Sequence, residues 1–274
     1  MSNLVIGWPI YSDPGALYTP TLSGGSWEAT LPLANLQDTR LAKVARSTDD
    51  AAASSQFEVD LGAARPVFVL AVPEHNISSA GTIRVRGSAT AGSFVSAIYD
   101  TGTVSVWATG LTTEKIDGIN LGWTLVMAAE YSARYWLFEV TDTTNPDTYI
   151  DLGRAIVAGG WQPTINMKYG AKLGLETETV RAVTEGGAAI YTPRPVRRTF
   201  TCVVPDLPED EGLTNGFDLQ RLAGTHGQMM VVYDPDDTTH MHRRAFLATL
   251  RTLSALEAVP LARLGVPLSF EEVL

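Results

Sequence analysis

The sequence predicts a mainly β protein with one helix, built as two domains of which the first is a β-sandwich. Short segments alternate between apolar and polar residues, which is the period of a half-buried strand. Gly, Pro, Asn and Asp interrupt these segments at short intervals, as in sandwiches whose strands are joined by turns. Hydrophobic residues make up 45% of the 274 residues, which is enough for a core. At about 150 residues per domain we expect two domains, which we place at 1–158 and 159–274.

The clearest strand of the N-terminal half is residues 56–62, where Phe57, Val59 and Leu61 point to one face and the acids between them to the other. Residues 66–72 are apolar on both faces, which predicts a central strand that is covered on both sides. The further strands expected in this half are residues 82–87, 135–140, 149–153 and 155–158.

The composition shifts at the Gly-Gly-Trp-Gln-Pro segment, residues 159–163, which marks the domain boundary. One helix is predicted after it, because acids at 206–211 stand where the positive end of a helix dipole favours them. Phe217 and Leu222 continue the helical pattern and Gly224 can end it. The strands expected in this half are residues 177–183, 198–204, 228–233 and 246–251.

Charge and composition exclude several classes of protein. The chain has 20 Lys and Arg against 30 Asp and Glu, a net charge of −10, which argues against nucleic-acid binding. A single cysteine excludes a fold built on internal disulfides. The first basic residue is Arg40 and the longest apolar run is Val67–Val72, far below the ~20 residues of a membrane span. We therefore expect a protein made in the cytosol, without membrane insertion.

No enzyme signature is present, so we expect no catalytic, cofactor-binding or metal-binding residues. The Gly-x-Ser-x-Gly elbow, the P-loop and the Gly-x-Gly-x-x-Gly fingerprint are all missing from the sequence. Glycoside hydrolysis needs two carboxylates that face each other across a cleft. This alternative stays open, because sequence spacing cannot show such a pair in a sandwich.

His240 and His242 would share one side of a strand, and Asp234, Asp236 or Asp237 just upstream could complete a metal site. Ordinary turn chemistry, with Asp-Pro-Asp-Asp leading into a strand, is the interpretation we favour. Cys202 alternates with Phe200 and Val204, which predicts a buried structural thiol.

Two other clusters have a functional and a structural interpretation. Arg194, Arg197 and Arg198 could hold a phosphate or an acidic neighbour, but arginines beside a strand start are more often solvated or paired at an interface. Exposed aromatic residues could stack on sugar rings, although tryptophans in sandwiches more often lie in a core or an interface. The candidates for stacking are Trp107, Trp123 and Trp161.

Several segments of residues 26–160 follow one another in a recognisable order. They are Leu-Ala-Asn-Leu-Gln-Asp-Thr-Arg at 33–40, Phe-Glu-Val-Asp-Leu-Gly at 57–62, His-Asn-Ile-Ser at 75–78 and Tyr-Trp-Leu-Phe-Glu-Val at 135–140. This order resembles the discoidin-like or galactose-binding-like β-sandwich found in tail proteins of tailed bacteriophages. Within it, His75 and Asn76 are interpreted as residues that fix a loop. The acidic loop through which such modules bind calcium has no counterpart here.

From Gly160 onward the chain resembles the C-terminal part of phage distal-tail or minor tail proteins, which are similar to tail-tube subunits. The segments that carry this likeness are residues 161–166, the Phe200 strand, the Phe217 helix and residues 268–274. The resemblance implies a tail-tube-like β-sandwich in the second domain and a galactose-binding-like β-sandwich, with an N-terminal arm, in the first.

The function implied by this resemblance is structural: a component of a tail tip or baseplate. Copies would form a ring, sixfold by analogy with the family, that connects the tail tube to the hub and to receptor-binding fibres. The protein would belong to the virion tail and be assembled in the host cytoplasm. The alternatives are a carbohydrate-binding module that attaches to host-surface glycan, and an enzyme such as a depolymerase on a sandwich scaffold.

Overall fold

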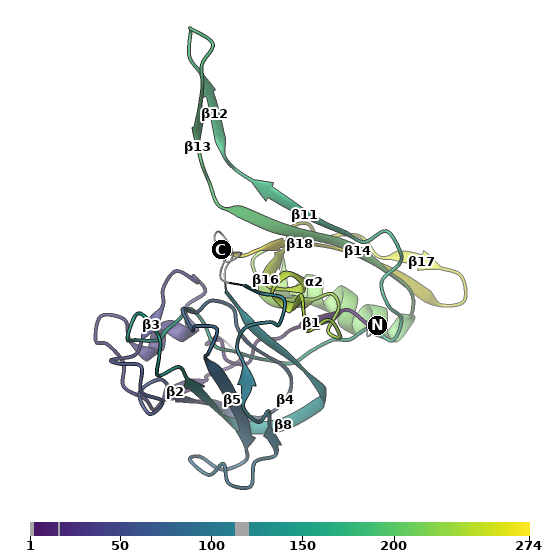
Figure 1. The fold of residues 1–274 in the computed structure, drawn as a ribbon. Helices are drawn as coiled ribbons and strands as arrows, with labels where there is room; N and C mark the ends of the chain where they lie inside the picture. The colour runs from purple at the N-terminus through teal and green to yellow at the C-terminus, as the bar shows by residue number, and fades with distance from the viewer. Residues whose placement is uncertain (1–2, 16, 113–120) are drawn as a thin grey trace. The chain divides into compact units, whose positions relative to one another are not determined.

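The computed structural model describes residues 3–15, 17–112 and 121–274 (Figure 1). Contacts divide the chain into two compact units. Unit 1 is Met1–Gln162 with Met229–Leu247, and unit 2 is Pro163–Gln228 with Ala248–Leu274. The chain therefore passes from one unit to the other at three places, whereas the sequence suggested a single boundary. The predicted domains at 1–158 and 159–274, as parts that fold independently, stay a prediction.

Unit 1 is built on an antiparallel sheet whose two longest strands are β4 (Phe57–Val72) and β8 (Trp123–Thr141). The sheet order is β10-β4-β8-β5-β6, with β2 beside β4 and β7 beside β5. The shorter strands are β2 (Thr21–Ser23), β5 (Thr82–Ser88), β6 (Tyr99–Asp100), β7 (Val104–Ser105) and β10 (Ile156–Ala158).

Strand β4 joins two segments that the sequence suggested as separate strands, residues 56–62 and 66–72. The pairing of β4 with β8 shifts register between Asp60 and Arg65. Gly62 lies in this stretch with a φ of +75°, so the irregularity bends the strand without ending it. The predicted inward face of Phe57, Val59 and Leu61 is confirmed, as is burial on both faces from Val67 to Val72.

The core of unit 1 lies between this sheet and a second layer. Phe57 stacks on Phe138 with ring centroids 4.9 Å apart, and Trp136 beside them is fully buried. The second layer contains η1 (Leu33–Gln37), β3 (Ala45–Arg46) and β9 (Asp151–Leu152), and it contributes Leu36 and Leu152 to the same core. Strand β3 pairs with β9, which brings the start and the end of the predicted N-terminal sandwich together.

Unit 1 also contains strand β1 (Val5–Gly7) near the start of the chain and the later segment Met229–Leu247. Strand β1 is buried throughout and pairs with β15 (Gln228–Val232), with Val5 opposite Val232. The short helix α3 (Met241–Arg244) follows. Strand β16 (Ala245–Leu250) begins in unit 1 and ends in unit 2. The predicted strands at 228–233 and 246–251 are confirmed.

Unit 2 contains an antiparallel sheet with a helix against one face. Strand β18 (Arg263–Glu272) lies between β14 (Val196–Pro208) and the end of β16, with β17 (Glu257–Val259) also paired to β18. The helix runs through α1 (Glu209–Glu211), η3 (Gly212–Phe217) and α2 (Asp218–Ala223). A Cβ on Gly216 would lie 2.8 Å from a Val266 methyl carbon, so the glycine lets this helix approach β18 closely.

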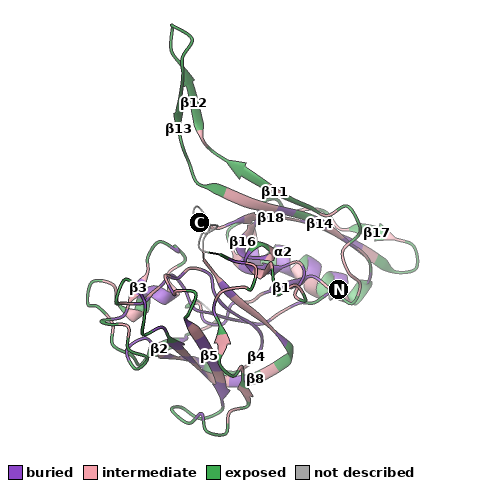
Figure 2. Ribbon diagram, in the orientation of Figure 1, coloured by how far each residue is buried: buried purple, intermediate pink, exposed green. Residues whose placement is uncertain are grey.

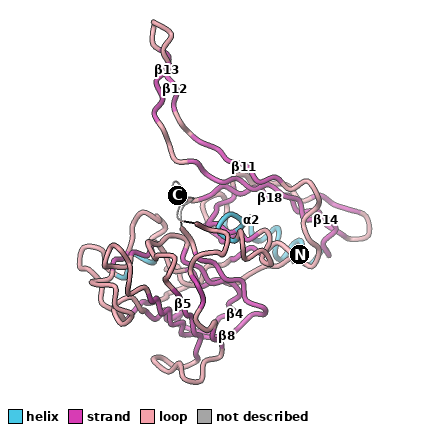
Figure 3. Tube along the Cα trace, viewed as in Figure 1, coloured by secondary structure: helices cyan, strands magenta, loops and turns pink. Residues whose placement is uncertain are grey.

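The predicted class, mainly β with one helix, is confirmed; Figure 3 shows strands and loops over most of the chain. Gly224 ends the helix with a φ of +56°, as predicted. The predicted strand at 177–183 is wrong in its bounds, because β11 (Lys172–Thr177) and β12 (Val180–Val183) are separate strands there. Within the described ranges, no helix has the length and apolar character needed to cross a membrane.

Candidate functional site

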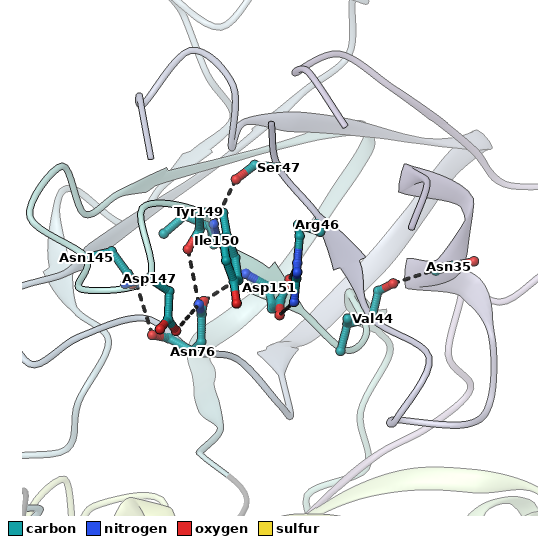
Figure 4. A network of polar contacts seen from close by, with 10 residues as sticks. All are labelled: Asn35, Val44, Arg46, Ser47, Asn76, Asn145, Asp147, Tyr149, Ile150 and Asp151. Atoms are coloured by element: carbon teal, nitrogen blue, oxygen red, sulfur yellow. Dashed lines mark hydrogen bonds and ion pairs between the residues drawn. The ribbon is translucent and has the colours of Figure 1, made fainter. Parts of the chain in front are cut away.

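Four features of the described residues have the character of a site: a polar network and a pocket in unit 1, and an exposed hairpin and a groove in unit 2. The polar network centres on Asn76 (Figure 4). Its Nδ2 donates to the Asp147 carboxylate at 3.0 Å and to the Tyr149 carbonyl at 3.1 Å, while its Oδ1 accepts from the Asp151 N–H at 2.7 Å. Asn76 thus ties the loop after β4 to the segment that leads into β9.

The same network contains an ion pair stacked on an aromatic ring. Arg46 donates two hydrogen bonds of 2.8 Å to the Asp151 carboxylate, and its guanidinium carbon lies 3.8 Å from the centre of the Tyr149 ring. The hydrogen bonds that Arg46 donates to Asp151 raise the pKa of Arg46 above its usual range. Arg46 is on β3 and Asp151 on β9, so the pair fastens these two short strands.

His75 and Asp142 are buried beside the network, and the side chain of each accepts a hydrogen bond from a backbone N–H group. The His75 Nδ1 accepts a hydrogen bond of 3.1 Å from the Ile77 N–H, and burial lowers the pKa of His75 to about 3. The Asp142 carboxylate accepts from the N–H and hydroxyl of Ser78 at 2.7 and 2.8 Å. These hydrogen bonds agree with the loop-fixing role inferred for His75 and Asn76.

A pocket of about 340 Å³ lies elsewhere in unit 1. It is lined mainly by apolar side chains, among them Trp107, Trp123, Leu125 and Met241. The Trp107 indole N–H donates to the Ile77 carbonyl at 2.8 Å, which holds the ring in place at the pocket. Threonine side chains also line it, so the pocket offers an aromatic wall with a few hydroxyl groups.

The tryptophans differ from the predicted exposed stacking platform. Trp123 and Trp161 are buried, with 5% and 8% of their surface exposed, and only Trp107 of the three is half-buried. Trp161 is held by backbone hydrogen bonds to Ile6 in both directions at 2.9 Å. The stacking interpretation is therefore wrong for Trp123 and Trp161, and the favoured interpretation, that tryptophans in a sandwich lie in its core, is confirmed for both.

The histidines of the alternative metal site do not share a strand face. His242 lies in helix α3 and His240 immediately precedes it, so the alternation expected of a strand does not apply. Arg244 contacts the carboxylates of both Asp234 and Asp237, and the latter also lies 2.9 Å from the His240 Nδ1. A guanidinium thus occupies the position where a cation would have to bind. Among the residues with described positions, no group of three or more metal-ligating side chains is assembled.

Cys202 and two of the three arginines have structural roles. Cys202 is buried beside Phe200 and Val204, as predicted, and burial raises its pKa to about 12. Arg197 donates to Glu271 at 2.8 Å, and Arg198 pairs with Glu272. Both acids belong to β18, so Arg197 and Arg198 join two strands of one sheet. This agrees with the interpretation that the arginines are paired and not with a phosphate site.

Unit 2 carries an exposed hairpin, residues 172–196, hereafter the projecting hairpin. It consists of β11, β12, β13 (Ala189–Thr192) and the first residue of β14, and β12 pairs with β13 around a turn at 184–188. Figure 1 shows it extending beyond the sheet of unit 2, and Figure 2 shows it exposed along its length. None of its residues is buried. The sequence analysis missed this feature.

The projecting hairpin is apolar where a solvent-exposed hairpin would be polar. Seven large apolar side chains on it are between 46% and 71% exposed. They are Leu173, Leu175, Val180, Val183, Ile190, Tyr191 and Val196. Leu173 lies opposite Phe200 and Leu175 lies opposite Arg198 in the register of β11 and β14, so these two exposed leucines share the sheet face on which Phe200 is buried.

A second exposed apolar surface of unit 2 is a groove beside α2, hereafter the helix groove. It encloses about 370 Å³ and is lined by Phe217, Gln220, Arg221, Leu253, Ser254 and Leu256. Phe217 and Leu253 are 49% and 55% exposed. The Gln220 Oε1 accepts a hydrogen bond of 2.7 Å from the Ser254 N–H, which fixes the loop against the helix.

Comparisons with known proteins found structures with a similar fold over about half of the chain. No protein-family model matches the chain, and no curated protein matches it. The chain is similar to CBM32-1 of a family 31 glycoside hydrolase from Clostridium perfringens, at 12% identity and a TM-score of 0.38, over 54% of this chain and 98% of that one. It is also similar to the lectin domain of lectinolysin complexed with Lewis B antigen, at 14% identity and a TM-score of 0.39, over 56% of this chain and 98% of that one.

A third similar structure is the family 32 carbohydrate-binding module of C. perfringens NanJ in complex with galactose. It has 16% identity and a TM-score of 0.37, over 50% of this chain and 92% of that one. About half of the chain is thus similar to galactose-binding-like β-sandwiches. Likenesses at this level do not carry a ligand over to this chain, and they do not bear on the bacteriophage resemblance, which stays a prediction.

Proposed function

We propose that this chain is a structural, non-enzymatic subunit that assembles with copies of itself in the tail tip or baseplate of a tailed bacteriophage. The observation that carries the proposal of assembly is the projecting hairpin, with its seven exposed apolar side chains. The proposal of a phage tail rests on the order of sequence segments described above. In that setting the ring would connect the tail tube to the hub and fibres.

An isolated two-stranded hairpin is marginally stable in water, and exposed apolar strands promote association. Fully burying one Val, Leu or Ile contributes about 1.5–3 kcal/mol. The hairpin side chains are roughly half exposed, so covering all seven would yield on the order of 7 kcal/mol. That is comparable with the costs of association, about 4–15 kcal/mol, so a partner surface that is itself apolar is required.

The charge of the chain fits a passive role beside DNA. A net charge of −10 would let nucleic acid pass through a ring without being retained, because like charges repel. His75, whose pKa is lowered by burial to about 3, is buried and accepts a hydrogen bond from the backbone. A role without bond making or breaking is consistent with that arrangement.

Light scattering coupled to size-exclusion chromatography of the full chain, with electron microscopy of the same fractions, tests the proposal. We expect discrete multimers or rings, and a shift towards monomer for Ile190→Asp in the projecting hairpin. Val95→Asp is the matched control, since Val95 is 98% exposed in unit 1 and the change should leave assembly intact. A chain that stays monomeric at all accessible concentrations, or that is missing from intact virions, would overturn the proposal.

A second candidate function is glycan binding by unit 1, and the pocket beside Trp107 favours it. Aromatic faces suit the apolar side of a sugar ring, and the neighbouring threonines could serve its hydroxyls. A glycan array with the full chain tests this, using Trp107→Phe as the variant. Trp27→Phe is the control, because Trp27 also donates its indole N–H to a backbone carbonyl, at 3.0 Å, and does not line this pocket. Failure to bind any glycan, or equal loss in both variants, would remove this candidate.

A further inference from the structure

We propose that the projecting hairpin of one copy binds in the helix groove of a second copy, so that the contact is head to tail. This inference rests on the proposed assembly function and specifies its partner surface. Both surfaces belong to unit 2, both are apolar, and both are exposed in the single chain. A hairpin–groove contact covers one face of the hairpin and the groove together.

The hairpin has a face suited to an apolar groove. Directly opposed residues of an antiparallel pair point to the same side. The pairs Val180–Thr192 and Ala182–Ile190 therefore form one face that carries no charge. The other face carries the pair Arg181–Tyr191, so its only charged side chain between 180 and 192 on the strands is Arg181.

Charge also favours the hairpin as a contact between identical acidic chains. Its charged residues are three bases, Lys172, Arg181 and Arg194, and three acids, Glu176, Glu178 and Glu185, so its net charge is zero. The whole chain has a net charge of −10, and copies repel one another over most of their surface. The hairpin is a segment of 25 residues in which that repulsion is absent.

The helix groove is neutral and fixed before any partner arrives. Its one charged lining residue, Arg221, is paired with Asp218 on the same helix at 2.9 Å. Gln220 is 6% exposed and holds the Ser254 loop, so the groove needs no rearrangement to open. Phe217 and Leu253 supply an exposed apolar wall to a volume of about 370 Å³. A neutral apolar ridge and a neutral apolar groove are complementary in chemistry.

The alternative, in which two hairpins pair with each other, would use the same patch on both copies and stop at two. It would also leave the helix groove exposed. A contact between two different patches is heterologous, and it continues from copy to copy until a ring closes or a filament forms. The head-to-tail arrangement therefore agrees with a ring, while mutual hairpin pairing does not.

Mixing two assembly-deficient variants tests the inference. Ile190→Asp leaves the groove intact, and Phe217→Asp leaves the hairpin intact. Each alone is expected to self-associate at least about 10-fold more weakly than the wild type. An equimolar mixture should form a 1:1 complex that does not grow further, measured by analytical ultracentrifugation with one variant labelled. Leu222→Asp is the control for Phe217→Asp, because Leu222 is 51% exposed on the same helix and does not line the groove.

The outcomes separate this inference from the proposed function. If the wild type and Phe217→Asp assemble equally well while Ile190→Asp does not, the groove is not the partner and only the inference fails. If both variants are monomeric and their mixture stays monomeric, the contact is not head to tail. If the wild type itself never assembles, both proposals fail. Circular dichroism melting of each variant shows that lost assembly does not come from unfolding.

Discussion

Replacing Asn76 with alanine removes three hydrogen bonds that join separate loops of unit 1. Two of them engage backbone groups, the Tyr149 carbonyl and the Asp151 N–H, and the third engages the Asp147 carboxylate. Each typical hydrogen bond contributes about 0.5–1.5 kcal/mol net, and an unsatisfied buried partner costs about 1–3 kcal/mol. Because these bonds are only partly buried, we expect Asn76→Ala to lower the free energy of unfolding by about 2–3 kcal/mol.

Urea denaturation at pH 7, followed by tryptophan fluorescence, measures this change. Arg84→Ala is the comparison in the same unit: it breaks a two-bond ion pair with Asp100 whose side chains are 39% and 36% exposed. Such a surface pair is worth at most about 1 kcal/mol. If Asn76→Ala costs no more than Arg84→Ala, the network does not fix these loops and the reasoning is refuted.

Asn76→Asp extends the same experiment. The new carboxylate keeps the acceptor for the Asp151 N–H but faces Asp147, to which Asn76 donates at 3.0 Å. Two like charges at this distance raise the pKa of one of them in the folded state. A carboxyl group with a raised folded-state pKa loses stability as the pH rises through that pKa. Asn76→Asp should therefore be less stable at pH 7 than at pH 4 relative to Asn76→Ala, and a constant difference between the two variants would contradict this.

Three further expectations concern single residues. Gly216→Ala should destabilise unit 2 by about 1–3 kcal/mol, because the added Cβ would lie 2.8 Å from Val266. Gly186→Ala is the control, since the space around Gly186 is open and the change should alter stability little. Equal melting temperatures of the two variants would contradict the close packing of the helix. His75 has a folded-state pKa of about 3, so the free energy of unfolding should fall by about 2 kcal/mol as the pH is lowered from 8 to 5. His75→Asn keeps an acceptor for the Ile77 N–H and should make the free energy of unfolding, measured by urea titration, less dependent on pH. Cys202, buried with a pKa of about 12, should react with a thiol reagent at pH 8 only after denaturation; rapid labelling of the native protein would show that it is accessible.

Strands with a regular alternation could be predicted from the sequence because one face meets a core. Residues 82–88 and the inward side chains of Phe57 and Val59 are examples. The continuity of β4 could not be predicted, because Gly62 and Pro66 are residues that usually end a strand. Here Gly62 adopts a positive φ and the strand continues past both. Local residue types alone do not distinguish a bulge from a strand end.

The candidate surfaces were harder to predict for a different reason. The sequence of the projecting hairpin has β-branched residues on both faces and a Gly-Gly pair near its turn, which is a usable hairpin signal. Its exposure is a tertiary property, because it depends on whether other segments pack over it, and none of the described segments buries it. The same holds for Trp123, which is buried, and for His242, which lies in a helix.

The crossing of the chain between its units affects how it must fold during synthesis. Strand β1 leaves the ribosome more than two hundred residues before its partner β15, so its edge stays unpaired while the segments between them are made. Strand β18 is made after both of its neighbours in the sheet, β14 and the end of β16, and lies between them. Each unit therefore depends on pairings between distant segments, and deleting β18 should impair the folding of a much larger part of unit 2 than its ten residues suggest.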